Sequence, residues 1–343
     1  MLLKLSEVAS LRGLLTKMDI AITGIGVISS IGHDRTSFHA NLAADRSKIG
    51  RPPFGDGPEF DGVWVSSIDD FAAEAWMPPH VVAGTDTFAQ YAIAASIDAV
   101  RDAGFPAPPD AERTAVVLGT ALSAVESVAA SQRGLDAHGV EGIDRKFHIK
   151  AWPNMAAAQV ALRWQLQGPL LTVATACASS LEAIGIAARM IASGQADCAI
   201  AGGADASMCE LRVLSGGRFG MFKPEADAAT ACRPFDRDRT GVVLGEGAGV
   251  VFLERLDHAR ARGARIHGVV RGYASLSDGY HVSSPEPTGA WEARTIARAI
   301  NDAKLPREAI DAVVAHGTGT KVGDSAEIRA INAAFGAHAE TLH

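Results

Sequence analysis

The stretch from Leu170 to Gly194 constrains the fold more than any other part of this sequence. It begins with the apolar, β-branched run 170–173, which is typical of a buried strand. Small residues around Cys177 follow, and then a helical pattern whose apolar residues recur at steps of three and four. Gly194 is suited to end this helix in the left-handed conformation. A strand that passes through a tight turn into a helix places Cys177 at the helix N-terminus.

This position predicts a reactive thiol at Cys177. Unpaired backbone N–H groups and the positive end of the helix dipole favour the thiolate over the thiol. The small neighbours Ala176, Ala178 and Ser179 leave room for a substrate to reach the sulfur. A free cysteine is more often inert packing than a nucleophile, so other features must decide between the two interpretations.

The order strand, helix, strand occurs twice along the chain. The two sets of segments are 22–30, 88–103 and 113–120, then 269–277, 291–303 and 311–318. This repetition predicts two related α/β halves, at residues 18–265 and 266–343. Residues 1–17 are amphipathic and lightly basic, and they precede a second methionine, Met18. We expect an upstream start or a loose extension there, with a transit peptide as the alternative.

Composition and charge narrow the classes of function. A net charge of −7 with no basic tract argues against a nucleic-acid surface, although an acidic carrier protein needs only a local basic patch. No apolar run approaches the ~20 residues of a membrane span. The four cysteines form no C-x-x-C pair and no cluster with zinc-ligand spacing, so we expect a reduced, cytoplasmic protein without a metal.

Two glycine-rich segments resemble nucleotide-binding motifs without meeting their requirements. Gly24 and Gly26 follow a predicted strand, but the third glycine is misplaced and no acidic residue closes a second strand about 20 residues later. Close packing of the backbone is the better interpretation of these glycines. Gly245, Gly247 and Gly249 precede a strand instead of joining a strand to a helix. We therefore expect no nucleotide cofactor.

His316 is the second candidate site residue. It ends a predicted buried strand that begins at Asp311, and it enters the turn Gly317–Thr320, at the edge of a sheet where side chains project into a cleft. A cysteine combined with a histidine from a different strand end is the arrangement of thiolate-based acyl transfer. Backbone N–H groups at the cysteine corner could stabilise an oxyanion.

With these residues in place, the sequence resembles the β-ketoacyl-acyl-carrier-protein synthases of the thiolase superfamily over residues 18–340. Five collinear segments carry the resemblance: Ile22–Val27, Thr172–Ser180, Cys232–Asp236, Gly241–Gly249 and His316–Glu327. The resemblance implies duplicated βαβαβ halves in a layered α/β/α/β/α arrangement. It also implies a protein that is usually dimeric, as a homodimer or with another ketosynthase, and a site with one cysteine and two histidines.

The resemblance also implies roles for individual residues. Cys177 would accept an acyl chain as a thioester, and its backbone N–H would form part of the oxyanion hole. His316 would assist decarboxylation of a malonyl thioester and stabilise the enolate, which then attacks the Cys177 thioester. Asp324 and Glu327 would support the site, or else be ordinary acids at a helix N-terminus. The partner would be acyl carrier protein, whose phosphopantetheine carries the substrates, so no separate cofactor is expected.

One departure from the family bears on activity. Family members continue into a lysine and a Gly-His segment, whereas this sequence ends at His343, and neither His338 nor His343 has the Gly-His context. We therefore expect an incomplete second half. A non-catalytic partner subunit is the main alternative to an active condensing enzyme, and a degradative thiolase is less favoured because the His316 turn is of the synthase type. Fatty-acid and polyketide pathways both stay open.

Overall fold

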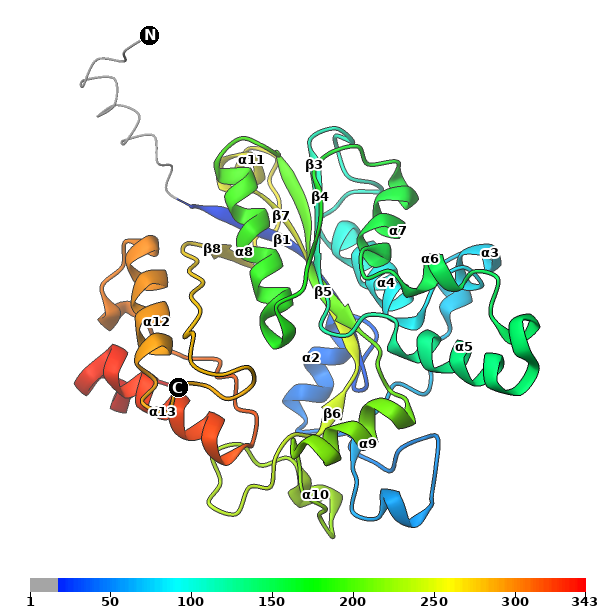
Figure 1. Ribbon diagram of the computed structural model, residues 1–343. Helices are drawn as coiled ribbons and strands as arrows, with labels where there is room; N and C mark the ends of the chain where they lie inside the picture. The colour runs from blue at the N-terminus through cyan, green and yellow to red at the C-terminus, as the bar shows by residue number, and fades with distance from the viewer. Residues whose placement is uncertain (1–17) are drawn as a thin grey trace.

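The computed structural model describes residues 18–343, so the extension expected at residues 1–17 lies outside the described part. The main sheet has six strands in the order β4-β3-β5-β7-β1-β8 (Figure 1). β3, β4 and β5 run parallel, whereas β7 is antiparallel to both β5 and β1. The bounds are β1 (Ile20–Ser29), β3 (Thr114–Gly119), β4 (Leu170–Val173), β5 (Cys198–Asp205), β7 (Gly247–Arg255) and β8 (Gly268–Val270); β2 (Val65–Ser66) and β6 (Leu244–Gly245) pair separately.

Helices cover both faces of the main sheet. The helices are α2 (Arg35–Ala43), α3 (Pro79–Val82), α4 (Thr87–Asp102), α5 (Val125–His138), α6 (Phe147–Ala151), α7 (Met155–Trp164), α8 (Ser179–Ala192), α9 (Glu210–Phe219), α10 (Ala228–Ala231), α11 (Leu256–Ala261), α12 (Ala290–Ala303) and α13 (Lys321–Phe335). Figure 1 shows α4 and α7 on one side of the sheet, and α8 on the other with α12 and α13 beyond it. The alternation of side chains along β3 explains both interfaces, because Val116 and Leu118 join the core with α4 while Ala115 and Val117 join the core with α8.

The two glycines of β1 are contact points between the strand and α4. A Cβ atom on Gly24 would lie 1.8 Å from the carbonyl oxygen of Ala99, and one on Gly26 would lie 1.8 Å from that of Ala95. Only glycine permits this approach of strand to helix. The interpretation of these glycines as close-packing residues is therefore confirmed.

The same contact recurs in the second half, where it supports an internal duplication. Gly272 packs on Ala299 of α12, with 2.3 Å between its would-be Cβ and the carbonyl oxygen. In each half the residue after the glycine donates its backbone N–H to an aspartate near the end of the helix. Asp102 accepts from the N–H of Ile25 at 3.0 Å, and Asp302 accepts from that of Tyr273 at 2.9 Å.

We expect Gly26→Ala to be strongly destabilising. The added methyl group meets the backbone of α4, which cannot rotate away, so the strand and helix must separate. Overpacking of this kind costs about 3 kcal/mol of unfolding free energy or more. Urea unfolding measures the loss. Gly249→Ala is the matched control on the neighbouring strand, because a Cβ there has no heavy atom within 4 Å; an equal loss in both variants would contradict this explanation.

The second half forms its helices but not its expected strands. α12 lies where the helix 291–303 was predicted, but the strand predicted at 269–277 is reduced to β8, and 311–318 is an extended segment without strand pairing. A strand needs neighbours for its backbone groups. Here Asp311 and Val313 bond only to the backbone of His343, at 3.0 and 2.9 Å, and Val314 is fully exposed. The prediction of a buried strand before His316 is therefore wrong, and the second half is incomplete in strands.

β4 also differs from the prediction, because it is an edge strand and not a buried one. Leu170 and Leu171 are 43% and 38% exposed, and β3 is the single neighbour of β4 in the sheet. Its apolar composition suits both positions, so strand propensity alone does not distinguish an edge from an interior strand. In residues 18–343 no helix is both long and apolar enough to cross a membrane.

Candidate active site

Cys177 lies in a one-turn 3-10 helix, Ala176–Ala178, between β4 and α8. Ala176 adopts a left-handed φ of +54°, which costs a residue with a side chain about 1–2 kcal/mol and must be held by its surroundings. Ser179 provides that restraint. Its hydroxyl accepts the N–H of Thr175 at 2.9 Å and lies 2.7 Å from the carbonyl oxygen of Ala176 and 3.1 Å from that of Thr120. The predicted place of Cys177, exposed at the start of a helix, is confirmed.

The carboxyl ends of two strands, β3 and β5, pack closely against the start of α8. A Cβ on Gly119 of β3 would lie 2.3 Å from the backbone carbon of Ser179, and one on Gly203 of β5 would lie 2.2 Å from the hydroxyl oxygen of Ser180. The parallel strands of the sheet therefore fix the position of the helix that carries Cys177. This agrees with the rule that sites of α/β sheets lie at the carboxyl ends of strands.

His316 belongs to the second half of the chain, and its side chain lies at the Cys177 site. It lies in the extended segment before α13, at a turn where Gly317 and Gly319 have φ values of +51° and +74°. The carboxylate of Glu327 on α13 accepts the backbone N–H of His316 at 2.6 Å and that of Gly317 at 2.9 Å. The imidazole forms a side-chain hydrogen bond with Cys177. The structure thus brings together the two residues singled out as the candidate nucleophile and its partner.

The hydrogen bond between Cys177 and His316 shifts the pKa values of both side chains in the directions that favour a thiolate–imidazolium ion pair. It lowers the pKa of the Cys177 thiol; burial opposes this, and the positive charges of His316 and Arg212 reinforce it. The same bond raises the pKa of His316, against partial burial and with help from the negative charges of Glu327 and Asp324. Opposite shifts widen the pH range over which a thiolate and an imidazolium coexist. The pair is therefore suited to nucleophilic attack with proton transfer.

Asp324 is the buried centre of a network that holds the His316 turn. Its side chain is 0% exposed, and its carboxylate accepts the N–H of Phe235 at 2.7 Å and that of Gly319 at 3.0 Å. The guanidinium of Arg239 lies 3.1 Å from the same carboxylate and also donates to the carbonyl oxygen of Thr320 at 3.1 Å. Asp324 is thus more than an acid at a helix N-terminus, because it ties segment 235–239 to the turn after His316.

Glu327→Gln is expected to weaken the support of His316 without unfolding the protein. The neutral amide loses the charge-assisted hydrogen bonds to the His316 turn and the negative charge that helps to raise the His316 pKa. We expect a lower His316 pKa by NMR titration and acyl transfer slowed by about tenfold. Glu340→Gln, at an exposed acid, is the control. An unchanged His316 titration would contradict the positioning role.

His338 does not join the pair of Cys177 and His316. His338 lies with its Nε2 atom 2.7 Å from the carbonyl oxygen of Ile310 and its Nδ1 atom 3.0 Å from the hydroxyl of Thr341. Within residues 18–343 no group of three or more His, Cys, Asp or Glu side chains is placed to hold a metal.

Ser179 and Arg239 were not found from the sequence, because their roles depend on tertiary hydrogen bonds that no local pattern encodes.

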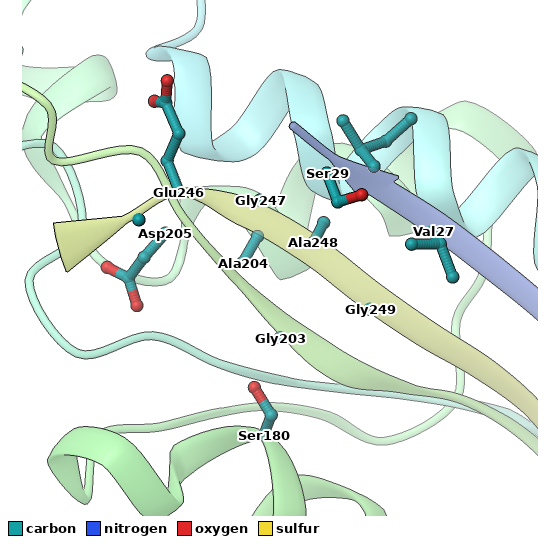
Figure 2. A pocket seen from close by; sticks show the side chains of 12 residues that line it. Val27, Ser29, Ser180, Gly203, Ala204, Asp205, Glu246, Gly247, Ala248 and Gly249 are labelled. Atoms are coloured by element: carbon teal, nitrogen blue, oxygen red, sulfur yellow. The ribbon is translucent and has the colours of Figure 1, made fainter. Parts of the chain in front are cut away.

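A cavity of about 430 Å³ lies beside the start of α8 (Figure 2). Ser180 lines it from the helix, and Gly203 and Asp205 line it from β5. Gly247, the first residue of β7, and Glu246, which precedes it, line the other side. Burial raises the pKa of Glu246, whose carboxylate accepts the N–H of Ile68 at 2.7 Å. Cys177 and His316 are not among the lining residues, so this cavity adjoins the candidate site without containing it.

Both halves of this chain match models of one known protein family. The profile "Beta-ketoacyl synthase, N-terminal domain" matches residues 17–259, and "Beta-ketoacyl synthase, C-terminal domain" matches residues 267–343. The 3-oxoacyl-[acyl-carrier-protein] synthase 2 of Vibrio cholerae serotype O1 is 35% identical over 324 residues, which cover 94% of this chain and 78% of the relative. The enzyme of the same name from Staphylococcus aureus strain COL is 32% identical with the same coverage.

Solved structures agree with these matches. The ishigamide ketosynthase/chain length factor superposes with a TM-score of 0.85 at 35% identity, covering 93% of this chain and 78% of the other. A beta-ketoacyl synthase from Burkholderia phymatum STM815 gives a TM-score of 0.84 at 32% identity, again over 93% and 78%. The thiolase-like α/β fold expected from the sequence is therefore confirmed.

Proposed function

Because this chain belongs to the β-ketoacyl synthase family, we propose that it is a β-ketoacyl-acyl-carrier-protein synthase that extends an acyl group held on Cys177. The hydrogen-bonded pair of Cys177 and His316 carries this proposal, since its pKa shifts favour a thiolate beside an imidazolium. Similarity to 3-oxoacyl-[acyl-carrier-protein] synthases at 35% identity supports the reaction class.

In the first step, the Cys177 thiolate attacks the thioester carbonyl of an acyl group on the phosphopantetheine of acyl carrier protein. Negative charge builds up on the carbonyl oxygen, and the backbone N–H of Cys177 at the start of α8 stabilises it. The carbon–sulfur bond of the donor then breaks, and the departing sulfur takes a proton from the His316 imidazolium. Cys177 is left as a neutral thioester beside a neutral imidazole.

In the second step, a malonyl thioester loses carbon dioxide, and the electron pair of the broken bond passes into an enolate. The neutral imidazole of His316 donates a hydrogen bond to the enolate oxygen. The enolate carbon attacks the Cys177 thioester, a carbon–carbon bond forms, and the bond to the Cys177 sulfur breaks. The product is a 3-oxoacyl thioester, and the Cys177 thiolate is released. His316 takes up a proton from solvent to replace the one given to the departing sulfur, so the thiolate and the imidazolium are both restored for the next cycle.

The β4 edge supports a dimer as the working form. Leu170 and Leu171 on this strand and Leu181 on the adjoining α8 are large apolar side chains exposed to solvent, with Leu181 at 70%. An apolar strand edge without a neighbour favours association with a second strand. The partner in this proposal is a second copy or another ketosynthase. We also propose a reducing, cytoplasmic setting, which keeps the free thiol of Cys177 available.

A non-catalytic partner subunit is the second candidate function. The exposed β4 edge favours it, and so does the resemblance to a structure named as a ketosynthase together with a chain length factor. In this alternative the chain would pair with an active ketosynthase, and the chemistry of Cys177 would not be used. Both candidates share the fold and the interface, so only a measurement of turnover separates them.

A condensation assay with acyl- and malonyl-acyl-carrier protein separates these candidates. We expect formation of a 3-oxoacyl product and release of carbon dioxide by the chain alone, and loss of both in Cys177→Ala. Fatty-acid and polyketide pathways are distinguished by which acyl donors are extended. If the chain alone produces neither product nor carbon dioxide but raises the turnover of an active ketosynthase, the partner-subunit function replaces the enzyme.

A further inference from the structure

Helix α8, which directly follows the turn of Cys177, is bound to the second half of the chain through Glu182 in its first turn. The Glu182 carboxylate accepts hydrogen bonds from the hydroxyl groups of Tyr273 and Ser275. The ring of Tyr273 lies against Gly185 of α8, where a Cβ atom would come within 2.2 Å of a ring carbon. Figure 1 shows the segment after β8 alongside α8. The second half therefore contacts the helix that positions the candidate nucleophile.

Tyr273 also connects α8 to α12. Its backbone N–H donates to Asp302 of α12 at 2.9 Å, and Arg189 of α8 forms an ion pair with the same carboxylate at 2.6 Å. Glu182, Gly185 and Arg189 follow one another at helical spacings of three and four, so they lie on one face of α8. Tyr273 contacts this face with its hydroxyl and its ring, while Asp302 holds its backbone.

The hydrogen bond from Tyr273 to Glu182 persists over the whole pH range in which a thiolate can act. Burial and the neighbouring Glu182 carboxylate raise the pKa of Tyr273 to about 12, so its hydroxyl remains a donor. The negative charge of Glu182 in the first turn also interacts favourably with the helix dipole. The contact is therefore a permanent restraint on the start of α8.

A shift of the first turn of α8 necessarily moves Cys177. Ser179, the first residue of the helix, accepts the N–H of Thr175 at 2.9 Å and lies 2.7 Å from the carbonyl oxygen of Ala176. The turn that carries Cys177 is thus hydrogen-bonded to the helix start and cannot adjust independently. A restraint at Glu182 is consequently a restraint on the Cys177 sulfur.

The geometry of the candidate pair depends on how the two halves meet, because Cys177 belongs to the first and His316 to the second. Asp324 fixes the turn that follows His316, and Glu182 fixes the helix that follows Cys177. We propose that Glu182 is a positioning residue that holds α8 against the second half, so that the Cys177 sulfur meets the His316 imidazole. This inference rests on the proposed function and adds a residue to its site.

The sign of the effect on Cys177 distinguishes positioning from a direct effect of charge. Loss of the Glu182 anion by itself would favour the thiolate and lower the pKa of the Cys177 thiol. Loss of positioning has the opposite effect. A weaker hydrogen bond between Cys177 and His316 raises the pKa of the thiol and lowers the pKa of the imidazole.

The test measures the pH dependence of Cys177 alkylation by iodoacetamide, followed by peptide mass spectrometry, and the titration of His316 by NMR. Tyr273→Phe changes no charge and keeps the ring, and Glu182→Ala removes the acceptor. In both variants we expect the alkylation midpoint to rise by about 0.5–1 pH unit, the His316 midpoint to fall, and acylation at neutral pH to slow about 3- to 10-fold. The double variant should match Glu182→Ala, because both changes act through one contact.

Two matched controls change the same residue types elsewhere. Glu210→Ala removes an exposed acid from the first turn of α9, and Tyr280→Phe removes the hydroxyl of an exposed tyrosine. Both should leave the two midpoints in place. Glu182→Gln retains an oxygen acceptor without the charge, so its midpoints should lie between those of wild type and Glu182→Ala.

The possible failures are distinguishable because alkylation does not require acyl transfer. An alkylation midpoint that stays in place or falls in both Glu182→Ala and Tyr273→Phe would overturn the inference, even if both variants lose stability in urea. If Glu182→Ala does not fold, Tyr273→Phe decides alone. A raised midpoint in these variants, together with a wild-type Cys177 that takes no acyl group from acyl-acyl-carrier protein, would support the positioning role and overturn the proposed function alone.

Discussion

His316→Ala is expected to slow acylation of Cys177 by about 10²- to 10⁴-fold, the usual contribution of a positioned acid–base group. His316 supplies the largest of the effects that lower the pKa of the Cys177 thiol. Without it, the thiol pKa rises toward its ordinary value of about 8.5, and each unit of increase lowers the thiolate fraction at neutral pH about tenfold. The departing sulfur also loses its proton donor.

The pH dependence of alkylation tests the electrostatic part of this prediction. A lowered thiol pKa means that iodoacetamide reacts with wild-type Cys177 at a lower pH than with an ordinary cysteine, and that the rate rises with pH through that pKa. In His316→Ala this rise should move to higher pH. His39→Ala, at an exposed histidine on α2, should leave the profile in place. Identical profiles in His316→Ala and wild type would show that the two side chains do not interact.

Asp324→Ala is expected to cost about 3–5 kcal/mol of unfolding free energy, the usual effect of removing one member of a buried ion pair. The substitution leaves Arg239, whose side chain is 12% exposed, without its carboxylate, and it removes the acceptor of two backbone N–H groups. The turn that carries His316 should loosen at the same time. Urea unfolding and the rate of Cys177 acylation measure the two effects.

Two comparisons make the Asp324 result interpretable. Asp238→Asn removes an acid whose pair with Arg237 is exposed, and it should change stability by less than about 0.5 kcal/mol. The double variant Asp324→Leu/Arg239→Met removes both charges together, so it should be less destabilised than the sum of the two single changes. Strict additivity would mean that the buried ion pair does not hold the network.

The sequence predicts the first half of the fold well because local and tertiary preferences agree there. The helix expected at 88–103 is α4, and the glycine expected to end the helix after Cys177 has a φ of +74° at Gly194. The extended segment before His316 is the counterexample. Its apolar residues have strand propensity, but hydrogen-bond partners decide whether a strand forms, and those lie elsewhere in the chain.

The candidate site was predicted only where a residue had a recognisable local setting. Cys177 before a helix and His316 before a glycine turn have one, and the structure places their side chains in contact. Glu327 and Asp324 were left open between support and helix capping, because the groups that they bind follow from the folded turn.

The most direct test of this account is the covalent state of Cys177 after incubation with acyl-acyl-carrier protein. Intact-protein and peptide mass spectrometry should find one acyl group on Cys177 and none on Cys232. Cys232 is also exposed, but partial desolvation of its thiol raises its pKa instead of lowering it. The Cys177→Ser variant should lose the thioester adduct. An unmodified Cys177 in the wild-type protein, or an acyl group on Cys232 instead, would contradict the assignment of Cys177 as the acyl-accepting nucleophile.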